Sequence, residues 1–157
     1  MNLKRQITHY LAATLILVGT AFPAFADVAT ATDDNDVILA GHDAVAYFTD
    51  GKPVLGSAEY SAQYDGAIYR FASAENRDRF RANPAKYAPA YGGYCALGTA
   101  FGKKFLVDGK AFEIVEGRLY VNKNLDVYET WRKAIPANIV KAEGNWPTIK
   151  DVPAGRL

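Results

Sequence analysis

The sequence predicts a small α+β fold: a small antiparallel sheet built from hairpins, with flanking short helices and a C-terminal helical segment. Strand-like segments pair across tight turns, and the helix signals lie in runs separate from the strands, which favours an antiparallel sheet. The chain has 157 residues, half of them apolar and 22% charged, with a net charge of +1. These values are typical of one globular domain and exclude disordered and disulfide-dense chains.

Turn chemistry identifies the expected strands. Asp65-Gly66 is a two-residue loop that suits the twist of a hairpin, and Glu116-Gly117 lies between a second pair of strand-like segments. The aromatic residues of the first hairpin should supply an aromatic face. The expected strands are residues 45–48 (followed by a turn at 49–52), 60–64, 67–71, 111–115 and 118–121.

Helix signals lie after each hairpin. Ser73 is a typical N-cap for a helix over residues 74–82, with Phe80 on its core face. Apolar residues at helical spacing in the tail should be core; these are Leu125, Tyr128, Trp131 and Ile135. The other expected helical segments are a turn from Asn83-Pro84 through Tyr87, a short helix at 94–101 after a tight turn at Gly92-Gly93, and a tail that is helical over 125–135, breaks at Pro136, resumes through Lys141 and closes at Asn145-Trp146-Pro147.

The first 26 residues have the pattern of a secretory signal. Lys4 and Arg5 precede an apolar run at 11–22, and Ala24-Phe25-Ala26 offers the small residues of a cleavage site. The apolar run is shorter than the ~20 residues that cross a bilayer. We therefore expect a periplasmic protein with no membrane span after cleavage. The expected organisation is a signal at 1–26, a flexible leader at 27–36, the domain at 37–150 and a tail at 151–157.

The mature chain would carry 16 basic and 17 acidic side chains. Its basic residues are dispersed among carboxylates, which excludes an electrostatic nucleic-acid binder. It keeps a single histidine, His42, and a single cysteine, Cys95, so no internal disulfide can form. A P-loop, a nucleophile elbow and a Cys-x-x-Cys motif are all missing from the sequence. An enzyme is therefore the less favoured interpretation.

The middle of the chain contains four distinctive segments: residues 41–48 (GHDAVAYF), 64–73 (YDGAIYRFAS), 83–87 (NPAKY) and 91–95 (YGGYC). Together they resemble an exported, single-domain member of the YHS domain family. The resemblance implies a small α+β fold with a central hairpin, and it implies metal binding or metal handling, with copper or zinc as the expected metals.

The metal-type members of this family carry three cysteines that this chain lacks. The corresponding positions are Ala46, Ala72 and Asn76. Soft metals such as Cu(I) prefer thiolates, and alanine offers no ligand. Any metal site in this chain must therefore use other residues.

The remaining candidate ligands are Cys95, His42 and Asp43. Cys95 follows Gly92-Gly93 at the start of an expected helix, where unpaired N–H groups would stabilise a thiolate. The alternative is that Cys95 is a small buried hydrophobic residue. His42 could be oriented by the adjacent Asp43 carboxylate as a metal-bound imidazole, although packing is the simpler interpretation. One thiol and one imidazole do not close a tetrahedral site, so Asp43 or a second protomer of a homodimer would be needed.

Three functions remain open from the sequence. The first is a binding module for a soft or borderline metal ion at Cys95. The second is a thiol redox or sensor protein, which would need a partner thiol. The third is a non-catalytic module that uses its tyrosine-rich surface to contact a protein partner.

Overall fold

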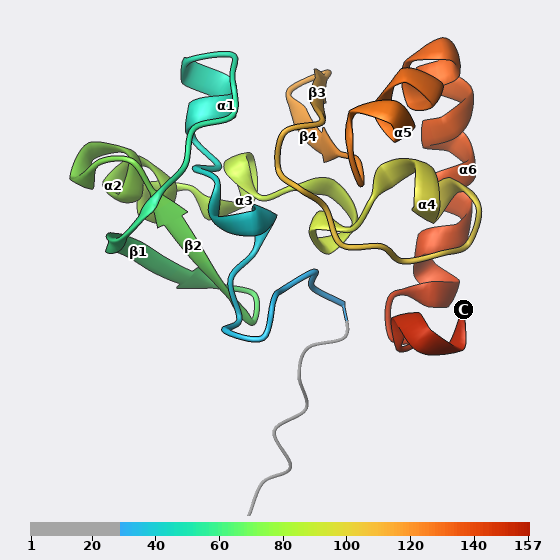
Figure 1. The fold of residues 1–157 in the computed structure, drawn as a ribbon, viewed down its shortest axis with the longest axis horizontal. Coiled ribbons are helices and arrows are strands. Elements are labelled where there is room, and N and C mark those ends of the chain that lie inside the picture. Colours follow the sequence, from blue (N-terminus) through green and yellow to red (C-terminus); the bar gives the residue numbers. More distant parts are fainter. Residues whose placement is uncertain (1–28) are drawn as a thin grey trace, which may run out of the picture.

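The computed structural model describes residues 29–157, so the predicted signal at 1–26 lies outside the described residues. Figure 1 shows two groups of elements side by side. The first group comprises η1 (Leu39–Gly41), α1 (Ala46–Thr49), β1 (Ser57–Tyr64), β2 (Ala67–Phe71), α2 (Ala74–Ala82) and α3 (Pro84–Tyr87). The second comprises η2 (Ala90–Gly93), α4 (Ala96–Ala100), β3 (Phe112–Val115), β4 (Arg118–Val121), α5 (Leu125–Trp131), η3 (Arg132–Ala134), α6 (Ile135–Ile149) and η4 (Ala154–Arg156).

The predicted α+β class and both predicted hairpins are confirmed. The strands form two separate antiparallel pairs, β1 with β2 and β3 with β4. Asp65 and Gly66 have φ of 50° and 75°, and Glu116 and Gly117 have φ of 51° and 76°. Two successive residues with positive φ give the turn whose twist matches that of paired strands, which is why these dipeptides close the hairpins.

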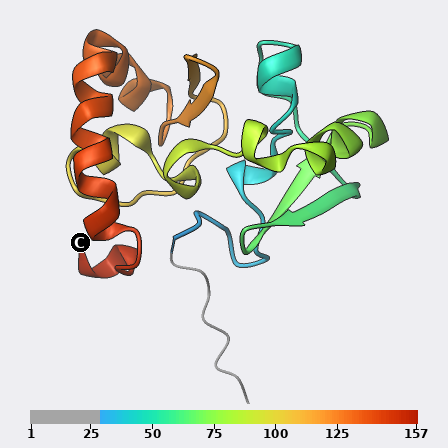
Figure 2. The ribbon, with the colours of Figure 1, turned by 180° about the vertical axis from the view of Figure 1, so that it is seen from behind.

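Strand β4 joins the two hydrophobic cores of the described chain. Leu119 and Val121 belong to the first core, which also contains the rings of Tyr69 and Phe80, in contact at a tilt. Tyr120, between them, belongs to the second core and lies 5.7 Å from Trp131, centroid to centroid. Successive side chains of a strand point to opposite faces, so one short strand holds both halves together. Figure 2 shows the same two halves from behind.

The predicted strand at residues 45–48 is wrong, because this segment forms helix α1. The cause is the side chain of Asp43. Its Oδ1 accepts hydrogen bonds from the backbone N–H groups of Val45 at 2.8 Å and Ala46 at 3.2 Å, as an N-terminal cap does. The strand preference of Val45, Tyr47 and Phe48 is outweighed by these bonds.

The tail also differs from the prediction. Pro136 is the second residue of α6, where its missing N–H costs nothing, so it starts a helix instead of breaking one. Pro147 lies inside α6, which continues to Ile149. Trp131 is fully buried as predicted, whereas Leu125 is 56% exposed and is not core.

The first described residues of the predicted flexible leader pack against the domain. Thr30 and Ala31 are buried, and the N–H of Ala31 donates to the carbonyl of Gly92 at 2.8 Å. A Cβ at Gly92 would lie 1.9 Å from the carbonyl oxygen of Ala29, so this contact requires glycine. Over the described range, no helix is both long and apolar enough to cross a membrane.

Candidate functional site

Asp43 lies at the centre of the first candidate site, and both of its carboxylate oxygens are hydrogen-bonded. Oδ1 accepts from the N–H groups of Val45 and Ala46. Oδ2 accepts from the N–H of Ala72 at 2.8 Å and from Nδ2 of Asn76 at 2.8 Å. The residue is completely buried. This carboxylate therefore connects the start of α1 to the end of β2 and to α2.

Three of the four donors to Asp43 belong to the positions where the resemblance places metal-binding cysteines. These donors are the backbone of Ala46, the backbone of Ala72 and the side chain of Asn76. The fold thus brings the three positions together around a carboxylate. The result is a hydrogen-bond network that supports the fold, because the carboxylate and its four donors are partnered within the protein.

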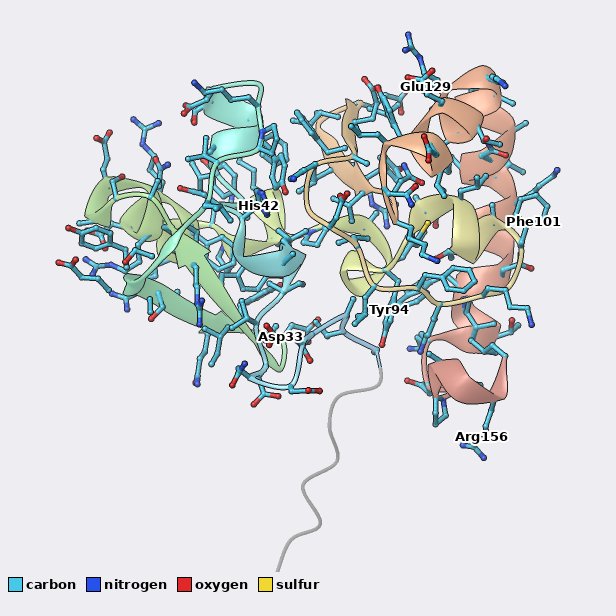
Figure 3. All side chains as sticks on the ribbon, in the orientation of Figure 1. Asp33, His42, Tyr94, Phe101, Glu129 and Arg156 are labelled. Carbon is cyan, nitrogen blue, oxygen red and sulfur yellow. The ribbon has the colours of Figure 1, made fainter. Side chains whose placement is uncertain are left out.

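His42 is 7% exposed and is held by the protein backbone. Its Nδ1 and its own N–H both lie 3.0 Å from the carbonyl oxygen of Leu39. The imidazole packs so closely on Gly109 that a Cβ there would lie 2.2 Å from Nδ1. Figure 3 shows His42 beside η1, in the first half of the molecule.

Cys95 is the residue before α4, and it is 1% exposed. Its Sγ accepts from the N–H of Gly98 at 3.4 Å, as the predicted helix-start position implies, and donates to Oδ1 of Asn122 at 3.7 Å. Burial nevertheless raises the pKa of the thiol above its usual value and outweighs the opposing effect of the nearby amides. Of the two interpretations that the sequence left open, a stabilised thiolate and a small buried residue, these observations favour the buried residue, because desolvation penalises the charged form more than the helix start favours it.

A pocket of about 260 Å³ opens at Cys95. Its walls are apolar apart from the thiol and one lysine. Two of its aromatic residues are exposed, Phe101 at 67% and Phe105 at 44%, and Figure 3 shows Phe101 at the outer edge of the second half. The lining residues are Cys95, Leu97, Gly98, Phe101, Phe105, Lys123 and Val127.

Gly98 explains how Phe105 comes to form a wall of this pocket. A Cβ at Gly98 would lie 2.8 Å from Cδ2 of Phe105, so the ring needs a glycine on α4 to pack there. The carbonyl of Phe105 accepts a hydrogen bond from the N–H of Cys95 at 3.0 Å. This bond holds the backbone at Phe105 beside the start of α4. The wall of the pocket at Phe105 is therefore fixed by a backbone hydrogen bond.

The structure brings the predicted site residues to different surroundings. Within residues 29–157, no three histidine, cysteine, aspartate or glutamate side chains gather so that they could hold a metal ion. Asp43 and His42 are engaged around η1 and α1, whereas Cys95 faces the pocket beside α4. Metal ligation by these residues stays a prediction.

Sequence reasoning missed Asn122, Phe105 and Lys123 as residues of the site. Asn122 is fully buried, and its Oδ1 accepts from the N–H of Leu97 at 3.1 Å as well as from Cys95. Asn122 lies 27 positions from Cys95 in the sequence, and no local sequence pattern predicts their contact. The one available signal was Gly98, a glycine inside a short helix, which often marks a close approach.

Comparison with known protein families identifies residues 45–91 as matching the YHS domain. The chain contains a YHS domain. The matched segment runs from the start of α1 into η2 and includes the β1–β2 hairpin, α2 and α3. Asp43 precedes the matched YHS segment and Cys95 follows it, so the pocket lies outside the match.

Two further comparisons, with curated proteins and with solved structures, found no match.

Proposed function

We propose that the protein is a small exported binding module whose binding site is the pocket at Cys95. The observation that carries the proposal is the exposure of Phe101 and Phe105 around an apolar hollow. Large apolar side chains gain free energy when they leave water, so an exposed aromatic pair beside a pocket is typical of a ligand site. Export rests on the pattern of the first 26 residues.

The fold supports a binding role because the pocket is held open by buried, hydrogen-bonded groups. Asn122 fixes both Cys95 and the N–H of Leu97, and the backbone of Phe105 is tied to that of Cys95. A preformed pocket spends little conformational entropy when a ligand enters. The raised pKa of Cys95 weighs against the thiol redox alternative, because the thiolate is the reactive form.

The proposal is tested by NMR titration of ¹⁵N-labelled mature protein with 3-phenylpropanamide, a neutral aromatic probe. We expect the largest shifts at Leu97, Gly98 and Val127. Val127→Phe should fill the pocket and abolish these shifts, whereas Val140→Phe, at a position 72% exposed on α6, should not. Leu97→Phe serves as a second pocket-filling variant. Shifts confined to other surfaces, or none, would reject the pocket as the binding site.

Soft-metal handling at Cys95 is a second candidate function. It is favoured by the position of the thiol in the pocket wall, together with the YHS match. The metal would have to displace the thiol proton, and a second ligand would have to come from another copy of the chain or from a protein partner, since Asp43 and His42 are bonded elsewhere.

Elemental analysis of untagged mature protein, beside Cys95→Ser, tests this second candidate. Near-stoichiometric copper or zinc that is lost in the variant would support metal handling at Cys95. Absence of metal from both proteins, after incubation with excess Cu(I) and removal of the unbound ion, would reject it.

A further inference from the structure

The pocket at Cys95 carries a positive charge at one side. Lys123 is the single charged residue among the described residues that line it. It is exposed, and its Nζ lies 5.3 Å from the centroid of the Phe105 ring. The ammonium group therefore stands next to the aromatic wall, within reach of a ligand held against that wall.

A second lysine stands by the other exposed aromatic residue. Nζ of Lys141, on α6, lies 5.9 Å from the ring centroid of Phe101. Asp126 precedes Val127 on α5 and is exposed, but it is not one of the lining residues. Lys141 likewise does not line the pocket, so the charge on the pocket itself is that of Lys123. Apolar rings beside one ammonium group are complementary to an apolar molecule that carries a negative charge.

The volume of the pocket limits the size of that molecule. At about 260 Å³ it lies just below the ~300 to 1,000 Å³ range of pockets for drug-sized ligands. One ring or one branched chain with a short charged arm suits this space. Leu97 and Val127, which also line the pocket, offer apolar contacts alone.

We propose that the pocket binds a small aromatic or branched aliphatic carboxylate, with the apolar group beside Cys95 and the carboxylate at Lys123. This inference rests on the proposed function, because it names the ligand class of the same pocket. The charge of Lys123 distinguishes the acid from its neutral analogue. Since the ion pair lies at an exposed rim, we expect a preference of about two- to fivefold for the acid.

The test compares 3-phenylpropanoate with 3-phenylpropanamide by NMR titration of mature protein at low ionic strength. We expect both probes to shift Leu97, Gly98 and Val127, and the carboxylate to bind about two- to fivefold more tightly. Lys123→Gln should remove that preference. Lys86→Gln is the matched control, because Lys86 is also exposed and its Nζ stands 5.1 Å from an aromatic centroid, that of Tyr87, away from the pocket.

Each outcome decides between the two proposals. Equal affinity for the two probes, or a preference that survives in Lys123→Gln, would overturn the carboxylate assignment and leave the pocket as a binding site. Failure of both probes to shift the pocket residues would overturn the proposed function itself. A preference lost in both lysine variants would indicate general charge attraction and would also overturn the assignment.

Discussion

The carboxylate of Asp43 accepts a hydrogen bond from Nδ2 of Asn76 at 2.8 Å, across 33 positions of sequence. Asn76 occupies a position at which the resemblance to metal-type YHS proteins implies a cysteine. Ala46 and Ala72 occupy the other two positions, and their N–H groups bind the same carboxylate. The fold thus places three hydrogen-bond donors from these positions around one carboxylate.

Asp43→Ala should strongly destabilise the fold, because it leaves buried donors without an acceptor. We expect a loss of about 3 kcal/mol in the free energy of unfolding. Urea denaturation measures it, with Asp34→Ala as the control, since Asp34 is exposed. A loss below about 1 kcal/mol for Asp43→Ala would show that the network contributes little to stability.

Gly109→Ala should destabilise the protein far more than Gly117→Ala. Both glycines have φ of 76°, so the backbone strain of a side chain is the same at the two positions. At Gly109 a Cβ would also lie 2.2 Å from Nδ1 of His42, whereas at Gly117 it meets nothing within 4 Å. We expect about 1 kcal/mol at Gly117 and at least about 2 kcal/mol more at Gly109, measured by urea denaturation. Equal losses would contradict the close packing of His42.

Lys104→Met should loosen the C-terminal end of the chain. Nζ of Lys104 is buried and donates to the carbonyls of Lys150 and Val152, just beyond α6. Removing this charged donor should cost about 2 kcal/mol and speed amide hydrogen exchange around Val152. Lys103→Met, at the neighbouring exposed lysine, is the control. Unchanged exchange in Lys104→Met would reject this anchoring role.

The buried thiol of Cys95 should make stability depend on pH in a defined direction. Burial raises its pKa, so the unfolded chain ionises first as pH rises. The contribution is fully present below the usual thiol pKa of about 8.5 and is lost as pH increases towards the folded value. Compared with Cys95→Ala, wild type should lose up to about 1.4 kcal/mol one pH unit above that usual value.

Urea denaturation of both proteins at about pH 7 and pH 9.5 checks this sign. The pKa values of Tyr47, Tyr69 and Tyr91 are also raised, chiefly by burial, but these residues are common to both proteins and cancel in the difference. A wild type that gains stability relative to Cys95→Ala at the higher pH would mean that the fold favours the thiolate.

Elements with local signals were predictable from the sequence. Asp65-Gly66 closes a hairpin as expected, and Oγ of Ser73 accepts from the N–H of Asn76 at 3.1 Å at the start of α2. Helix α1 was not predicted, because its strand-forming side chains are outweighed by the cap from Asp43, and the orientation of that carboxylate depends on donors some 30 positions away.

The candidate site was predictable only in part. The position of Cys95 at a helix start follows from the glycines before it, and the structure has it there. Its burial depends on Asn122 and Phe105, which reach it through tertiary contacts. Burial raises the pKa of the thiol whereas the helix start would lower it, so local sequence alone could not decide between the two interpretations of Cys95.

The most direct test of the central claim is the rate at which N-ethylmaleimide alkylates Cys95 with and without 3-phenylpropanamide. Cys95 is one of the residues that line the pocket, so we expect a bound probe to slow the access of the reagent to the thiol. At a probe concentration ten times its dissociation constant, we predict that alkylation slows about tenfold in wild type and in Val140→Phe. An unchanged rate at a probe concentration that saturates the NMR shifts would contradict binding at Cys95.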